Sequence, residues 1–128
     1  MELQLKKISK SFPGVKALNE ISFIIKKKTV HGIVGENGAG KSTLVKILAG
    51  IHKIDKGEIL LKGKKINFNS PKSALNNSIS VIHQETSIFE NLTVIENIFI
   101  SKLPLKKHIF IDWEKIKNKT TSILKRLG

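Results

Sequence analysis

Apolar and polar residues alternate near the start of the chain in the pattern of a β-strand with one buried face. Leu3, Leu5 and Ile8 are the apolar positions, and lysine and glutamine residues lie between them. The turn sequence Ser11-Phe12-Pro13-Gly14 ends this segment. Further strands are predicted for residues 18–25, 29–34 and 79–83, and a hairpin for residues 58–61 and 66–68. The run at 29–34 is short and apolar, which is typical of a buried strand.

Later segments show helical spacing or the residues that begin helices. Apolar residues recur at helical spacing from residue 41 to residue 49, and Gly50 ends that helix. Three more helices are predicted from residues that cap a helix N-terminus. These caps are Ser70, followed by Pro71, for a helix ending near residue 77; Thr93 with Glu96, for residues 93–100; and Asp112, for a last helix with Trp113, Ile116, Thr120, Ile123, Leu124 and Leu127 on one face.

The order of these elements predicts an α/β fold. Strands come first, a strand–loop–helix unit follows, and the last third is helical. We expect a β-sheet and phosphate-binding core over residues 1–84 and the start of a helical subdomain over residues 85–128. No apolar run approaches the roughly 20 residues that span a bilayer, and no secretory signal pattern is visible, so a cytoplasmic location is expected.

The strongest chemical signal lies between the third predicted strand and the first predicted helix. The segment Gly35-x-x-x-x-Gly40-Lys41-Ser42 fits the phosphate-binding P-loop pattern at every fixed position. Glycines allow a tight wrap of backbone N–H groups around phosphates, and the helix that follows adds its own free N–H groups. The residues assigned to nucleotide binding are Gly35, Glu36, Asn37, Gly38, Ala39, Gly40, Lys41, Ser42 and Thr43; Lys41 is also assigned to catalysis and Ser42 to Mg²⁺.

The formal net charge of +13 raises the alternative of nucleic-acid binding. The lysines occur in short scattered groups, Arg126 is the single arginine, and aromatic residues make up only 5% of the chain. This pattern favours a solvated surface, and we expect no nucleic-acid partner. The chain has no cysteine and no histidine pair with zinc spacing, and His31 and His83 are expected at structural strand positions.

The sequence in and around the P-loop resembles the ATPases of ABC transporters. The resemblance runs from about Leu3 to Gly128 and includes the segments 35–44, 46–50, 57–63 and 81–85. The segments 68–71, 83–85 and 96–100 are most similar to importers of ribose, galactose and related sugars, which usually carry two cassettes in one polypeptide. The family implies a P-loop NTPase fold of the ABC type.

The resemblance implies roles for two residues outside the loop. Phe12 stands where the family places an aromatic ring that stacks on adenine. From the sequence alone, a hydrophobic residue before a Pro-Gly turn is an equally good interpretation. Gln84 is similar to the glutamine that contacts Mg²⁺ or the attacking water and couples the site to the membrane partner, so it is assigned to catalysis and to the metal.

The resemblance also implies partners: ATP with Mg²⁺, transmembrane permease subunits, a second cassette, and indirectly a sugar-binding protein, at the inner face of the membrane. The signature segment, the Asp-Glu pair and the switch histidine of the family are not found. We therefore expect an N-terminal fragment of the first nucleotide-binding domain that binds ATP without hydrolysing it. A soluble ABC-family ATPase of repair or translation, and a defunct truncated product, remain as alternatives.

Overall fold

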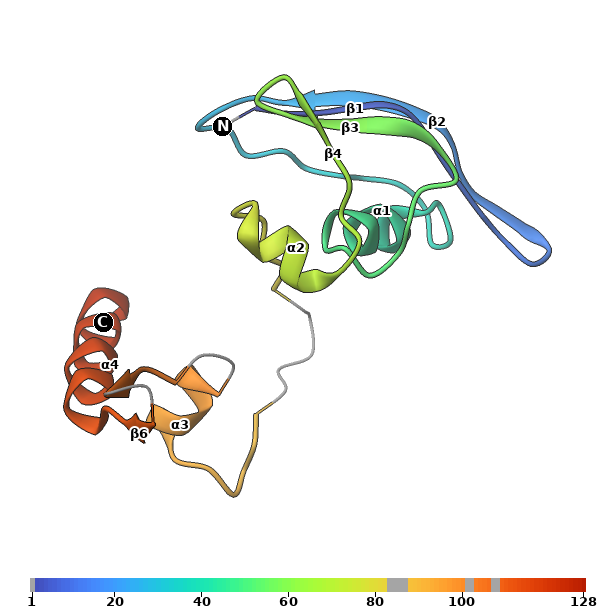
Figure 1. Cartoon of the computed structure of the whole chain (residues 1–128). Coiled ribbons are helices and arrows are strands. Elements are labelled where there is room, and N and C mark those ends of the chain that lie inside the picture. Colours follow the sequence, from blue (N-terminus) through green and yellow to red (C-terminus); the bar gives the residue numbers. More distant parts are fainter. Residues whose placement is uncertain (1, 83–87, 101–102, 107–108) are drawn as a thin grey trace. The chain divides into compact units, whose positions relative to one another are not determined.

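The computed structural model describes residues 2–82, 88–100, 103–106 and 109–128. The chain divides into two compact units, Met1–Ile82 and His83–Gly128. The elements of the first unit are β1 (Leu3–Phe12), β2 (Val15–Ile25), α1 (Lys41–Leu48), β3 (Lys56–Leu61), β4 (Lys64–Ile66) and α2 (Pro71–Asn76). Those of the second are α3 (Val94–Phe99), β5 (Leu105–Lys106), β6 (Phe110–Ile111) and α4 (Trp113–Leu127), all shown in Figure 1.

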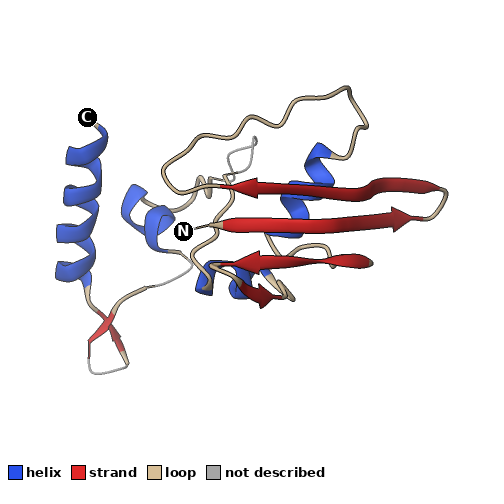
Figure 2. Cartoon of the chain, turned by 90° about the horizontal axis from the view of Figure 1, so that it is seen from above, coloured by secondary structure: helices blue, strands red, loops and turns tan. Residues whose placement is uncertain are grey.

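The first unit is built on an antiparallel sheet with the strand order β2-β1-β3-β4, in which the strands lie side by side (Figure 2). In the central strand β1, Leu5 lies opposite Phe23 of β2 and Ile59 of β3, so three apolar side chains form one row across the sheet. The predicted strands at 3–8 and 18–25 are confirmed, and so is a hairpin whose turn lies between Leu61 and Lys64. Its second strand covers residues 64–66 instead of the predicted 66–68, so residues 67 and 68 lie beyond the ladder. Sheet and helices together confirm the α/β fold.

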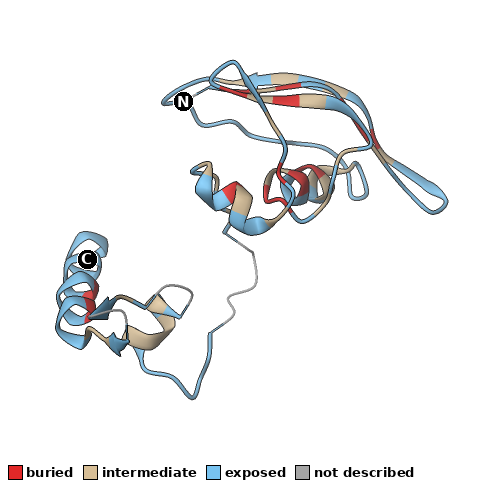
Figure 3. Cartoon of the chain, viewed as in Figure 1, coloured by how far each residue is buried: buried red, intermediate tan, exposed pale blue. Residues whose placement is uncertain are grey.

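The hydrophobic core of this unit joins one face of the sheet to α1 and α2 (Figure 3). Leu5 and Ile8 of β1 and Ile47 of α1 are at most 1% exposed, and Ala74 of α2 belongs to the same cluster. Burying one such leucine or isoleucine stabilises the fold by about 1.5–3 kcal/mol. This packing fixes α1, and with it the loop that precedes α1, against the sheet.

The helix boundaries follow the predicted caps. Helix α1 ends next to Gly50, which has φ +73°. The hydroxyl of Ser70 accepts a hydrogen bond from the backbone N–H of Ser73, and Pro71 occupies the first turn of α2. Both predicted starts, at Lys41 and at Pro71, are therefore confirmed.

Two predicted strands are wrong. Residues 29–34 have no regular secondary structure, and Val30 and Val34 are 100% and 96% exposed. Residues 79–82 are not a strand either, and His83 lies outside the described residues. The reason is pairing: a short apolar segment becomes a strand only through neighbours, and among the described residues the sheet ladder includes neither segment. His31, expected in a strand, is an exposed residue of this irregular segment.

The second unit contains α3 and α4, with a short β5–β6 hairpin between them. The capping box of α3 is confirmed, because Thr93 N–H donates to the Glu96 carboxylate over 2.8 Å and the Thr93 hydroxyl accepts from Glu96 N–H. The Asp112 carboxylate caps α4 by accepting from Lys115 N–H over 3.0 Å. No helix in the described parts of either unit combines the length and apolarity that crossing a membrane requires.

The predicted apolar face of α4 is only partly buried. Ile116 and Thr120, one turn apart, are the buried residues of this helix. Trp113, which the sequence placed on this apolar face, is 52% exposed and is not a core residue. Trp113 is the first residue of α4 and lies one turn before the buried pair, whereas Leu127 at the other end is 80% exposed. Helical periodicity predicted the direction of this face but not how far along the helix it is covered.

Candidate phosphate-binding site

The loop before α1 has the backbone conformation that its glycines were expected to permit. Gly38 and Gly40 have φ +85° and +87°, a left-handed conformation that L-residues with a Cβ adopt at a cost. Gly40 also lies against β2: a Cβ there would be 2.3 Å from the carbonyl oxygen of Ala17 and 2.8 Å from a methyl carbon of Leu18. The loop thus enters α1 through a point where only glycine fits.

The N-terminus of α1 has neither a side-chain cap nor an acidic residue in its first turn. Gly40 is the N-cap and supplies no side-chain hydrogen bond, and the first turn of α1 has no acidic residue. The unpaired N–H groups and the positive end of the helix dipole are therefore available to an anion. Ser42 and Thr43 lie in this first turn, so their hydroxyls are close to the same end of the helix.

The ammonium of Lys41 is bound back onto the loop. Lys41 Nζ donates to the carbonyl oxygen of Gly35 over 2.7 Å and to that of Glu36 over 2.8 Å. A hydrogen bond from Ala39 N–H to the Glu36 carbonyl, 3.2 Å long, tightens the same turn. These contacts place the positive charge at the loop that carries the glycines. Residues 35–43, which the sequence assigned together, thus form one continuous local structure.

Beside the loop lies an apolar groove of about 400 Å³. Its lining residues come from β2, from the loop and first turns of α1, and from the irregular segment that was expected to be a strand. The lining residues are Leu18, Ile21, Phe23, His31, Gly32, Ile33, Val34, Ala39, Gly40, Lys41 and Leu44. The groove shows that the segment at 31–34 runs along the core without closing onto it.

Phe12 lies at the end of β1, next to the β1–β2 turn, and is 37% exposed. Its ring meets the His52 ring edge-on, with centroids 5.2 Å apart and an interplanar angle of 69°. Lys10 Nζ lies over the Phe12 ring, 5.4 Å from its centroid. Among the described residues, no hydrogen bond or ring contact joins Phe12 to the loop at 35–42. The first unit therefore contains two separate clusters: Phe12 with Lys10 and His52, and the glycine loop with Lys41.

Asp55 binds the residues of β1 that precede Phe12 and was missed by the sequence reasoning. Its carboxylate accepts from Lys10 Nζ and from Ser11 N–H, each over 2.7 Å. These two hydrogen bonds, the one from Lys10 first, hold the pKa of Asp55 below its ordinary value. No spacing rule pairs positions so far apart in the chain, so only the antiparallel pairing of β1 with β3 brings them together.

Gln84, assigned to Mg²⁺ and to the attacking water, lies outside the described residues, so its role stays a prediction. Within the part of the chain that the structure describes, no group of three or more His, Asp or Glu side chains could hold a metal ion.

Comparison with known proteins gives a consistent result. The family model described as "ABC transporter" matches residues 18–128. The chain is 51% identical over 121 residues to the putative ribose/galactose/methyl galactoside import ATP-binding protein 2 of Agrobacterium fabrum, covering 94% of this chain and 24% of that protein. It is 47% identical over 128 residues to the galactose/methyl galactoside import ATP-binding protein MglA of Clostridium tetani, covering 98% and 25%.

Solved structures agree with this result. A nucleotide-free ATP-binding cassette from an ABC transporter aligns with a TM-score of 0.72 and 34% sequence identity, over 80% of this chain and 41% of the other. The ADP conformation of an ATP-binding cassette aligns with a TM-score of 0.52 and 39% identity, over 56% and 28%. This chain spans about a quarter of the length of the curated relatives that it matches.

Proposed function

The chain belongs to the ABC transporter family, and from that premise we propose that it binds Mg²⁺-ATP at residues 35–43 as part of the ATP-binding subunit of a sugar importer. The observation that carries this proposal is the loop itself. Gly38 and Gly40, both with a left-handed backbone conformation, precede a helix whose first turn has no acidic residue. The ammonium of Lys41 is hydrogen-bonded to the same loop. An anionic group with several oxygens fits this arrangement of N–H donors and one cation.

Different residues of the site would bind different parts of Mg²⁺-ATP. Backbone N–H groups of residues 36–40 and of the first turn of α1 would bind phosphate oxygens, with the Ala39 N–H giving up the Glu36 carbonyl. Lys41 would likewise exchange its carbonyl partners for the β- and γ-phosphates. Mg²⁺ usually binds substrate phosphates together with a few protein oxygens, and the Ser42 hydroxyl fits that role. Thr43 would donate to a phosphate oxygen. Phe12 would stack on the adenine, and Gln84 would contact Mg²⁺ or the attacking water.

The transport part of the proposal rests on the relatives, whose names place them in ribose and galactose import. By that likeness, the partners would be permease subunits in the membrane, a second cassette, and a sugar-binding protein acting through the permease. The site of action would be the cytoplasmic face of the membrane. The import names of these relatives favour this function over an ATPase of repair or translation.

A titration with a matched pair of variants tests the phosphate site. Lys41→Ala should lower the affinity of the purified chain for Mg²⁺-ATP by about tenfold or more, since a charge-assisted hydrogen bond is worth about 1.5–3 kcal/mol. Lys46→Ala is the control, because Lys46 lies in the last turn of the same helix and its loss changes the net charge equally. Equal affinities of wild type and Lys41→Ala, by calorimetry on folded proteins, would refute the proposal.

The transport role needs a cellular experiment. Lys41→Ala, introduced into the gene in its own organism, should abolish uptake of labelled ribose or galactose, while Lys46→Ala should leave uptake unchanged. Undiminished uptake of both sugars in the Lys41→Ala strain would refute the assignment to sugar import while leaving nucleotide binding intact.

A further inference from the structure

We propose that Asp55 is a positioning residue for nucleotide binding: it holds the Lys10 ammonium over the Phe12 ring and thereby fixes that ring for the base. This inference rests on the proposed function, since it concerns the base end of the same nucleotide. It adds to that function a residue that contacts no nucleotide itself and acts through its neighbours.

Asp55 is tied to β1 by three hydrogen bonds. Its own N–H donates to the Ser9 carbonyl oxygen over 3.0 Å, and its two carboxylate oxygens accept from Lys10 Nζ and from Ser11 N–H. The residue therefore binds three successive positions of β1 immediately before Phe12. A carboxylate with both oxygens engaged in this way is fixed in orientation, and so is the end of the strand that it contacts.

Lys10 links Asp55 to the Phe12 ring, because its ammonium contacts both. Residues 10 and 12 are two positions apart in β1, so their side chains lie on the same side of the strand. The Lys10 side chain is only 16% exposed despite its charge. Its ammonium is shared between the Asp55 carboxylate, at 2.7 Å, and the Phe12 ring, at 5.4 Å. This distance is within the range of a cation–π interaction. The ion pair with Asp55 thus fixes the position of the Lys10 ammonium, and that ammonium contacts the Phe12 ring.

His52 contacts the ring at another point. Its ring meets Phe12 edge-on, and its backbone N–H is bound to the Lys46 carbonyl at the end of α1. The ring therefore contacts both a cation and an imidazole, and Phe12 as a residue is still 37% exposed. A flat partner such as a purine can then stack on what is left, without the entropy cost of ordering a free side chain.

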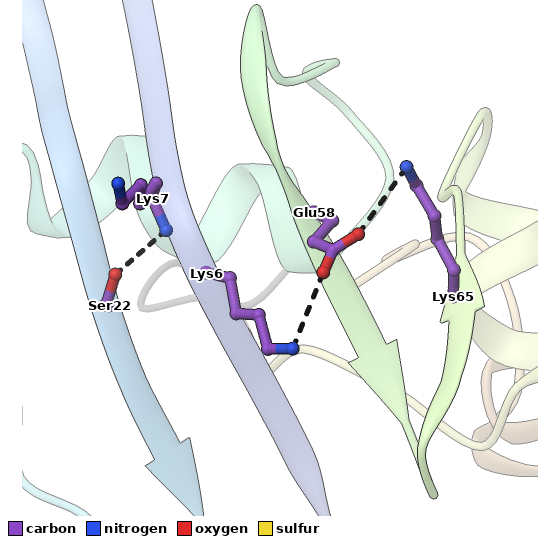
Figure 4. A network of polar contacts seen from close by, with 5 residues as sticks. All are labelled: Lys6, Lys7, Ser22, Glu58 and Lys65. Atoms are coloured by element: carbon purple, nitrogen blue, oxygen red, sulfur yellow. Dashed lines mark hydrogen bonds and ion pairs between the residues drawn. The ribbon is translucent and has the colours of Figure 1, made fainter.

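A second acid–lysine cluster in the same sheet supplies the matched control. Glu58 of β3 lies 3.6 Å from Lys6 Nζ and 3.6 Å from Lys65 Nζ, and Figure 4 shows its carboxylate between the two lysines. Glu58→Gln removes one charge between two lysines, as Asp55→Asn does beside Lys10. None of the contacts drawn around Glu58 involves Phe12.

The test separates the base from the phosphates. Mg²⁺-ATP and Mg²⁺-tripolyphosphate are titrated into wild type, Asp55→Asn, Lys10→Met, Lys10→Arg and Glu58→Gln. Asp55→Asn and Lys10→Met should bind ATP about threefold more weakly and bind tripolyphosphate as wild type does. Lys10→Arg should keep most of the ATP affinity, since it retains a cation, and Glu58→Gln should match wild type with both ligands.

A nucleotide-free measurement reads the position of the ring directly. Asp55→Asn should shift the ring-proton resonances of Phe12 and His52, whereas Glu58→Gln should not. Unchanged resonances, or equal losses for ATP and tripolyphosphate, overturn the inference alone. If neither ligand shows an affinity that depends on Lys41, the proposed function fails and the inference fails with it.

Discussion

The Lys41 ammonium donates to the carbonyl oxygen of Gly35 over 2.7 Å, so the first residue of α1 bridges back to the first glycine of its loop. The contact closes the loop on itself, with the Glu36 carbonyl as a second acceptor. Binding of a phosphate at this loop would therefore replace existing hydrogen bonds rather than recruit a free lysine. The loop is organised before any ligand arrives, and this reduces the entropy that binding must overcome.

Gly40 and Gly38 provide a direct test of this loop. Gly38→Ala should destabilise the fold by about 1 kcal/mol, since Gly38 has a left-handed φ but nothing within 4 Å of an added Cβ. Gly40→Ala should cost clearly more, because the same strain is joined by a Cβ 2.3 Å from the Ala17 carbonyl oxygen. Urea unfolding of both variants measures the difference. Equal unfolding free energies would show that the loop does not pack on β2 as described.

Asn97 should control the order of residues 89–93. Its amide N–H₂ donates to the carbonyl oxygens of Phe89, Leu92 and Thr93 at 3.0–3.1 Å, and its carbonyl accepts from Phe89 N–H. Asn97→Asp removes the donors and keeps an acceptor, so amide exchange in this segment should accelerate about tenfold, for a loss of about 1.4 kcal/mol. Asn118→Asp on α4 is the control. Unchanged exchange in Asn97→Asp would contradict the role.

Acid should weaken the first unit through Asp55. Hydrogen bonds from Lys10 and Ser11 lower the pKa of Asp55 in the folded state. A lowered folded pKa gives stability that is present above the unfolded pKa, near pH 4, and is lost as the pH falls through the folded value. The difference in unfolding free energy between wild type and Asp55→Asn should therefore shrink between pH 7 and pH 3. A difference that is constant across this range would show that the carboxylate is not engaged.

The purified 128-residue chain should show no steady-state ATP hydrolysis above background. Four of its described carboxylates are engaged elsewhere: Asp55 with Lys10, Glu58 with two lysines, and Glu96 and Asp112 as helix caps. A fifth, Glu36, lies within the phosphate-binding loop itself. Hydrolysis needs a group that orients water and charges that stabilise the transferred phosphoryl. Phosphate release is the measurement. Turnover of about one per second, lost in Lys41→Ala, would show that a complete site is present.

Local sequence signals predicted most of the first unit and most helix starts. Ser70, Thr93 and Asp112 cap helices as expected, because a cap depends on residues only three positions apart. The alternation of Leu3, Leu5 and Ile8 predicted β1 for the same reason. The P-loop was also a local pattern: in the structure residues 35–40 form the loop, and Lys41 and Ser42 begin α1.

Features that depend on distant residues were not predictable. The apolar run ending at Val34 looks like a strand, but strand formation is decided by partners that a short segment does not specify. Trp113 fits the helical stripe, yet its burial depends on what packs against the first turn of α4. The contact between Lys10 and Asp55 joins residues 45 positions apart, and only the register of β1 on β3 reveals it.

The exposed segment from residue 29 to residue 34 has a consequence for how the chain behaves in solution. It carries no Lys, Arg, Asp or Glu, it is rich in β-branched residues, and its backbone is unpaired in the sheet ladder of the described residues. Such a segment is a template for intermolecular pairing. The formal charge of +13 opposes the approach of two copies, but added salt screens that repulsion. Concentrated solutions of the chain should therefore stay clear at low ionic strength and become turbid as salt is added.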